Sequence, residues 1–246
     1  MLCQFPLTFA AQKMTKMQFQ RIQKALADYE NFLKSGSPSE TRLYYWESLR
    51  IFQENWNIES TDFAQMFDQS LQNTQTRRLW NRENYEPKRI MLLFISMQSD
   101  FVRQLFSDLF NESRDIAGRM DRFVFYCEEL LEDYRRMNPV TKENSHFHND
   151  NYQMLSLYLA FRYPERYAPY DFQVFQDLMI RLGSPDIPQN NDPERYFKVM
   201  RTLQGLLHKQ SNLLQLHEAR INAPAYYAGE SLLLAFDFAC FCTGKS

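Results

Sequence analysis

The chain has 246 residues, of which 44% are hydrophobic and 15% aromatic, and its formal net charge is −2 at pH 7. This content supports a folded core and excludes a disordered chain, and the six glycines disfavour a β-barrel, a Rossmann fold or a phosphate-binding loop. Because basic residues are not in excess, binding to nucleic acid would need a local basic patch.

The N-terminal segment and the cysteines bear on the cellular compartment. Residues 1–11 lack the basic region of a signal peptide. Helical periodicity begins only after residue 14, so we expect residues 1–14 to be a disordered or non-native leader. No apolar run approaches the roughly 20 residues of a membrane span, so no membrane contact is expected. The cysteines, at positions 3, 127, 240 and 242, have no disulfide-framework spacing, which indicates free thiols in the cytoplasm.

Apolar residues recur at helical spacing in the first half of the chain, and each such run predicts an amphipathic helix. Residues 73–86 are polar and loop-like. Residues 15–137 are expected to form an N-terminal helical subdomain. The predicted helices cover residues 15–34, 39 to a break at 55–57, 60–71, 87–95, 100–110 and 114–136.

The second half begins after residues 138–150, which are the expected linker because they contain a proline, several asparagines and two histidines. Residues 151–246 are expected to form a C-terminal helical subdomain, in which the apolar segment 231–242 fits either a helix or a buried strand. The predicted fold is all-α, with roughly ten helices packed as an irregular bundle and at most a minor strand pair. The other predicted helices here cover residues 151–161, 171–182, 193–209 and 212–220.

The stretch 157–172 carries two prolines among tyrosines and phenylalanines. A helix cannot continue through Pro164 without losing a hydrogen bond, so we expect it to end near Arg162 and the next helix to begin at about Asp171. Tyrosine and arginine side chains often dominate binding interfaces, so this turn is a candidate partner-binding site. The same tyrosines would equally fit a packed corner between helices. The partner-binding candidates are Arg162, Tyr163, Arg166, Tyr167 and Tyr170.

A second candidate surface is the segment 75–89, where basic and aromatic residues alternate. Basic side chains neutralise phosphates, and aromatic side chains stack on bases. The other interpretation is a solvated loop whose tryptophan packs into the core. The nucleic-acid-binding candidates are Arg77, Arg78, Trp80, Arg82, Lys88 and Arg89.

His146 and His148, followed by Asp150, are residue types that bind metals. A zinc site needs a third protein ligand at a suitable spacing, and the remaining histidines are the distant His208 and His217. We therefore predict a polar linker and no metal. An enzyme with a composite site that uses the two linker histidines and a carboxylate is the alternative.

The last four residues, Thr-Gly-Lys-Ser at 243–246, end like a phosphate-binding loop, but that motif requires glycine where Ala239 stands. No set of nucleophile, base and orienting residue can be assembled from the sequence pattern. We therefore predict that the chain has no catalytic activity and no cofactor.

Five stretches, in order within residues 40–175, resemble the helical region ahead of the motor module in some McrB-like AAA+ GTPases of modification-dependent restriction systems. The resemblance implies target recognition, often of modified DNA, beside a GTP-hydrolysing motor and a separate nuclease. This chain departs from the pattern because it has no Walker A motif and no room for a motor of about 200 residues, so we expect a solitary copy or a fragment. The stretches are 46–57 (WESLRIFQENWN), 62–66 (DFAQM), 84–89 (NYEPKR), 109–115 (LFNESRD) and 157–170 (LYLAFRYPERYAPY).

With that resemblance, the preferred prediction is a non-catalytic recognition or adaptor module of a McrB-like restriction or defence system. Its expected partners are DNA and a separate AAA+ GTPase or nuclease subunit. The alternative is a helical protein-interaction scaffold with no nucleic-acid role. Local charge separates the two, because convergence of residues 75–89 with Arg162 and Arg166 on one face favours nucleic acid, whereas faces of mixed sign favour the scaffold.

Overall fold

A computed structural model describes residues 9–35, 42–73, 82–149 and 151–245, with only the backbone described for 9–17 and 82–85. Over these residues the chain forms ten helices and no strand, which confirms the predicted all-α fold. The helices are α1 (Phe9–Ser35), α2 (Tyr44–Asn55), α3 (Phe63–Ser70), α4 (Arg82–Leu109), α5 (Ile116–Met137), α6 (Gln153–Arg162), α7 (Phe172–Arg181), α8 (Pro193–Leu207), α9 (Ser211–Arg220) and α10 (Leu233–Thr243).

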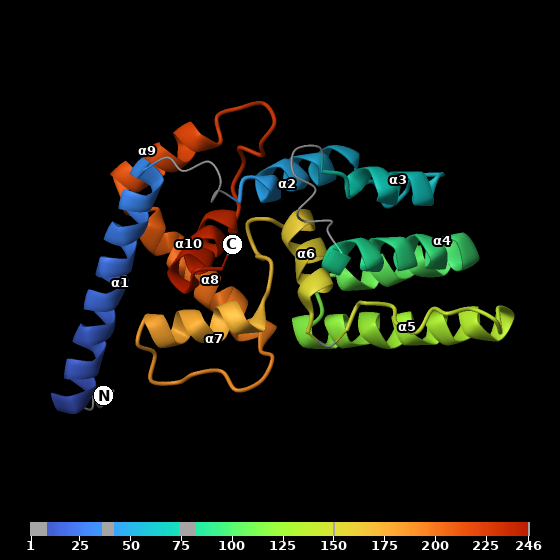
Figure 1. Cartoon of the computed structure of the whole chain (residues 1–246), viewed down its shortest axis with the longest axis horizontal. Coiled ribbons are helices and arrows are strands. Elements are labelled where there is room, and N and C mark those ends of the chain that lie inside the picture. Colours follow the sequence, from blue (N-terminus) through green and yellow to red (C-terminus); the bar gives the residue numbers. More distant parts are fainter. Residues whose placement is uncertain (1–8, 36–41, 74–81, 150, 246) are drawn as a thin grey trace.

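The helices form two groups with α6 between them (Figure 1). In one group α3, α4 and α5 lie side by side, and α2 leads into α3 and packs against α6. In the other group α10 packs against α1, α7 and α8, while α9 packs along α1. A contact between α5 and α8 joins the two groups.

One hydrophobic core runs through both groups. It includes Phe106 of α4, Phe123 of α5, Tyr158 of α6 and Phe238 of α10, each fully buried. Helices from before and after the predicted linker pack directly on one another, since α2 contacts α6 and α1 contacts α10. The packing of the described residues therefore shows no separate N-terminal and C-terminal subdomains. The linker segment 138–149 contains no helix, but it runs back along α5 and buries both of its histidines (Figure 1).

Aspartate side chains fix the starts of four helices. Each accepts a hydrogen bond from the backbone N–H three residues later, at 2.7–3.0 Å, and so satisfies an amide that has no partner inside the helix. At the other end of α7, Gly183 has φ +74°, a left-handed conformation that glycine adopts without strain. The four capping residues are Asp62, Asp115, Asp171 and Asp192.

At two places the helices differ from the sequence predictions, and at a third the structure decides between two predicted alternatives. Helix α1 begins at Phe9, so residues 9–14 are helical and not part of a disordered leader. Helix α4 joins two predicted helices, although Gln98 keeps non-helical angles (φ −144°, ψ 64°) at the predicted break. The segment 231–242 contains α10, a helix whose residues 233–240 are all buried, so the strand interpretation was wrong there.

A buried charged cluster, formed by Tyr29, Arg42, Arg220 and Asp237, joins α1, α9 and α10. Oδ1 of Asp237 lies 2.9 Å from Nε of Arg42, and Oδ2 accepts hydrogen bonds from Arg220 at 2.8 Å and from the Tyr29 hydroxyl at 2.5 Å. Burial alone would raise the pKa of Asp237, but Arg220, Arg42 and the Tyr29 hydroxyl hold it below its ordinary value. The cluster therefore contains an ionised and paired carboxylate.

Candidate functional site

The tyrosine-rich turn forms where the sequence places it, because α6 ends at Arg162 and Asp171 caps the next helix. Its tyrosines differ in environment. Tyr170 is only 1% exposed, and its hydroxyl donates to Asn191 at 3.2 Å and accepts from the backbone N–H of Asp192 at 3.1 Å. Tyr170 is therefore a core residue of the packed corner and presents no surface to a partner.

Tyr167 belongs to a polar network that docks the turn on the loop before α5. Its hydroxyl donates to Glu112 at 2.6 Å and accepts from the buried guanidinium of Arg119 at 2.9 Å. Arg166, which is more exposed, donates to the other oxygen of Glu112 at 2.6 Å. Burial would raise the pKa of Glu112, but the hydrogen bonds from Tyr167 and Arg166 lower it. These two candidates are thus already engaged within the chain.

Four of the six predicted nucleic-acid-binding residues lie outside the described residues or lack a described side chain. Arg77, Arg78 and Trp80 lie outside them, and Arg82 is described by its backbone alone. Their roles stay predictions.

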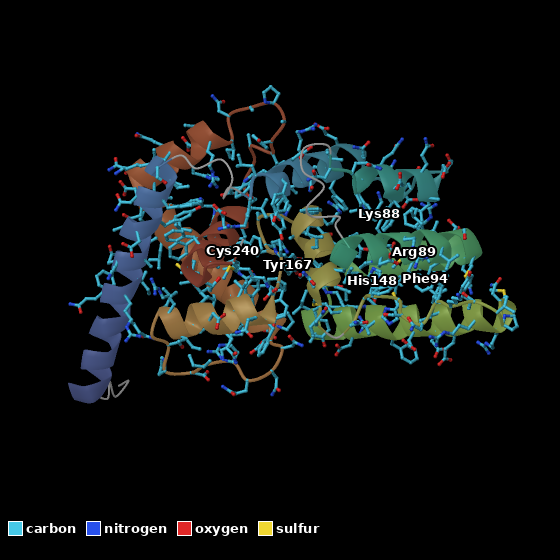
Figure 2. All side chains as sticks on the ribbon, viewed as in Figure 1. Lys88, Arg89, Phe94, His148, Tyr167 and Cys240 are labelled. Carbon is cyan, nitrogen blue, oxygen red and sulfur yellow. The ribbon has the colours of Figure 1, made fainter. Side chains whose placement is uncertain are left out.

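The described members of this set, Lys88 and Arg89, lie on α4 (Figure 2). Nζ of Lys88 lies 2.8 Å from a carboxylate oxygen of Asp68, and the Lys88 side chain is only 9% exposed. Arg89 donates two hydrogen bonds to Glu143, at 3.0 and 2.8 Å, and one to Glu86 at 2.9 Å. Both cations are therefore neutralised by neighbouring carboxylates, and this part of the surface has mixed sign.

Arg162 and Tyr163 line a groove that we call the recognition groove. Its cavity volume is about 380 Å³, within the range of ligand pockets. The lining comes from the C-terminal ends of α2, α4 and α6 and from the residues that follow each of these helices. It consists of Phe52, Gln53, Trp56, Asn57, Ile58, Ser107, Phe110, Arg162 and Tyr163.

The recognition groove combines aromatic walls with one cation. Trp56 stacks on Phe52, with ring centroids 4.8 Å apart and planes 12° apart, and meets Phe110 edge-on at 5.6 Å. The guanidinium of Arg162 lies 4.8 Å from the centroid of the Tyr163 ring. Arg162 is exposed and forms no ion pair with any residue that the structure describes. Sequence reasoning missed Trp56 and Phe110 because their apolar character is the same as that of core residues.

A second arrangement, which we call the histidine cluster, comprises Cys127 of α5, His146, His148 and Tyr158 of α6. The sulfur of Cys127 and one ring nitrogen of each histidine lie within 4.8 Å of one another, and all three residues are buried. Burial lowers the pKa of His146, although the nearby carboxylate of Glu128 acts in the opposite direction. Burial also lowers the pKa of His148 to about 3 and raises the pKa of the Cys127 thiol. The groups are therefore neutral at physiological pH.

The sequence did not indicate that the thiol of Cys127 lies beside the two histidines. About half of α5 and most of the following segment separate Cys127 from the histidines in sequence. Only the return of residues 138–149 along α5 brings the sulfur near them. The available signal was its place on the apolar stripe of α5, which predicts burial but not a neighbour. Asp150, the acidic residue of that sequence pattern, lies outside the described residues.

Comparison with known proteins found no matching family model, no matching curated protein and no matching solved structure. The resemblance to McrB-like systems therefore has no support from these comparisons. Among the described helices, none combines the length and the apolar character needed to cross a bilayer. Function has to be inferred from the recognition groove and from the charges around it.

Proposed function

We propose that this chain is a non-catalytic recognition module that binds a segment of a partner protein in the recognition groove. The observation that carries this proposal is the exposed guanidinium of Arg162, unpaired within the described chain, above the Tyr163 ring at a concave surface. Arginine and aromatic residues in concave, partly desolvated positions supply most of the binding energy in protein interfaces.

The groove lining favours an acidic segment that carries an apolar or aromatic side chain. Arg162 is the one charged side chain in the lining, and a guanidinium can bind a carboxylate through two parallel hydrogen bonds. Trp56 and Phe110 offer apolar walls on which such a side chain can pack.

The same lining supports the absence of catalysis. It contains no histidine, cysteine or carboxylate, so it offers no evident general base and no activated nucleophile. Its one hydroxyl-bearing serine, Ser107, donates to the backbone oxygen of Arg103 at 2.9 Å.

Charge elsewhere favours a protein partner over nucleic acid. Lys88, Arg89 and Arg166 each pair with carboxylates of the chain, whereas binding to DNA requires several cations free to neutralise phosphates. DNA binding stays a second candidate, because the basic residues of segment 75–89 motivate it. A McrB-like defence system and a separate AAA+ GTPase or nuclease partner are proposals that rest on the resemblance alone. A cytoplasmic location is a proposal that rests on the cysteine pattern.

A displayed library of random peptides, selected on the purified chain, tests this proposal. We expect enrichment of peptides in which a carboxylate neighbours an aromatic or apolar side chain. Arg162→Ala should weaken binding of the selected peptides about 30-fold, which corresponds to the roughly 2 kcal/mol of an interface hot spot. Labelled single-stranded and duplex DNA should bind neither form tightly.

The matched control is Arg136→Ala, because Arg136 is also exposed but lies on α5 and pairs with Asp133. Neither substitution should change the free energy of unfolding by more than about 0.5 kcal/mol, so a loss of binding cannot be ascribed to unfolding. Enrichment of basic peptides, which the partial negative charge of helix C-termini would favour, or equal binding to both variants would overturn the proposal. Tight DNA binding by the wild type, without peptide binding, would replace it with the second candidate.

A further inference from the structure

The residues of the histidine cluster come from three places in the chain and meet at a single buried point. Cys127 belongs to α5, Tyr158 belongs to α6, and His146 and His148 lie in the segment 138–149, which runs along α5 (Figure 1). Figure 2 labels His148. All four residues are at most 4% exposed. Sulfur and imidazole nitrogen are the donor types that zinc selects in proteins.

The hydrogen bonds of His148 leave one lone pair available at the cluster. Its Nδ1 lies 2.7 Å from the backbone oxygen of His146, and because a carbonyl can only accept, Nδ1 carries the proton. Nε2 therefore has the lone pair, and it lies 3.0 Å from the Tyr158 hydroxyl. Histidines that bind metals usually donate their other ring N–H to a carbonyl or a carboxylate in this way.

His146 shows the same division between its two ring nitrogens. Its Nδ1 accepts the backbone N–H of His148 at 3.0 Å, so the proton resides on Nε2, which lies 3.2 Å from a carboxylate oxygen of Glu128. This is the carboxylate–histidine arrangement that orients metal ligands. Each ring thus donates a hydrogen bond to an oxygen through one nitrogen. The lone pair of its other nitrogen accepts a hydrogen bond from an uncharged group.

The backbone between the histidines adds an independent observation. Phe147 has φ +59°, a left-handed conformation that costs a non-glycine residue free energy and persists only where the surroundings impose it. Phe147 lies between the two histidines, and the backbone N–H of His148 donates to Nδ1 of the His146 ring at 3.0 Å. The strained residue therefore lies at the point where both rings are brought together.

We propose that Cys127, His146 and His148 bind a zinc ion that fastens segment 138–149 to α5. Ligand atoms in a tetrahedral zinc site lie about 3.3–3.6 Å apart, so donors already within 4.8 Å of one another need to move by only about 1 Å. Binding would convert the Cys127 thiol to a thiolate and release its proton to solvent. Three protein ligands leave the fourth tetrahedral position to a water molecule.

Metal analysis of the full chain, produced without a metal-affinity tag and dialysed after incubation with zinc sulfate, tests the site. We expect stoichiometric zinc in the wild type and at least a tenfold loss in Cys127→Ala and His148→Ala. Tyr158→Phe should change zinc binding by less than about tenfold, because the hydroxyl contacts Nε2 of His148, the nitrogen that would bind zinc, and does not hold the other ring nitrogen as an outer-shell partner would. The matched controls are Cys240→Ala and His217→Gln, which replace a buried cysteine and a buried histidine of the other helix group and should keep full zinc.

A spectroscopic readout on the wild type covers the case in which a ligand variant does not fold. Cobalt in place of zinc should give the near-ultraviolet absorption of a thiolate–cobalt bond and the visible bands of a tetrahedral ion. A folded wild type that binds no zinc or cobalt, or zinc that is retained in both folded ligand variants, would overturn the proposal. The zinc site is independent of the recognition groove, so neither result bears on peptide binding.

Discussion

The charged cluster and the histidine cluster both lie largely out of contact with solvent, but they avoid the cost of burying charge in opposite ways. Asp237 stays ionised because Arg42, Arg220 and the Tyr29 hydroxyl surround it. The histidine cluster stays neutral, because burial lowers the pKa of His148 to about 3 and raises that of Cys127. Pairing makes each partner in the first cluster depend on the others, whereas neutral groups can lose one hydrogen bond at modest cost.

The largest effect should follow from removing the carboxylate of the charged cluster. Asp237→Ala leaves the guanidinium of Arg220, which is 12% exposed, without its ion-pair partner. Breaking a buried pair in this way costs about 3–5 kcal/mol, because an uncompensated charge stays buried. Urea denaturation of the variant and the wild type would measure this loss in the free energy of unfolding.

An exposed pair provides the control for that substitution. Asp133 pairs with Arg136 on the surface of α5, where their side chains are 38% and 73% exposed. Asp133→Ala should change stability by less than about 1 kcal/mol. If Asp237→Ala cost no more than this control, the charged cluster would not depend on pairing and the contrast between the two clusters would fail.

The sequence predicted most of the helices because their signals are local. Pro164 ends α6 at Arg162, and Asp171 caps α7, since both effects act within a single turn of backbone. The segment 231–242 could not be assigned, because it is apolar at almost every position and so shows neither period. The early start of α1 at Phe9 was missed because residues 9–14 carry no clear helical stripe.

The candidate sites were less predictable, because they depend on contacts between distant parts of the chain. Nothing local distinguishes Tyr170, which is buried in the corner, from Tyr163, which lines the recognition groove. The carboxylates that engage Lys88 and Arg89 include Asp68 and Glu143, far away in sequence. Residue type suggested which side chains could act, but tertiary packing decided which are free to do so.

A pH titration sharpens the comparison at His217, a neutral group beside the charged cluster. Its ring lies 5.3 Å from that of Trp46, and burial, followed by the cation of Arg220, lowers its pKa to about 4. The unfolded value is about 6.5, so between these pH values the unfolded chain binds more protons than the folded one. The stability that this group contributes is therefore complete above about pH 6.5 and is lost as the pH falls toward 4.

The expected size of this loss is about 3 kcal/mol, because each pKa unit corresponds to about 1.4 kcal/mol. Urea denaturation of the wild type and His217→Gln from about pH 7 to about pH 4.5 would measure it. Carboxylates with lowered pKa, such as Asp237 and Glu112, also lose stabilising charge in acid, but both proteins share them. The wild type should therefore lose more stability than the variant on acidification, and parallel curves would contradict the prediction.

The smallest effect is expected in the histidine cluster, where Tyr158→Phe removes the hydroxyl that lies 3.0 Å from Nε2 of His148. In metal-free protein this deletes one hydrogen bond between neutral groups, which should cost about 1 kcal/mol in the free energy of unfolding. Tyr196→Phe is the matched control, because that buried hydroxyl donates to the backbone oxygen of Pro169 at 2.6 Å and should cost about the same. If Tyr158→Phe cost as much as Asp237→Ala while the control stayed small, the hydroxyl would be supporting a charged group. The histidine cluster would then be held by pairing, and the difference between the two clusters would disappear.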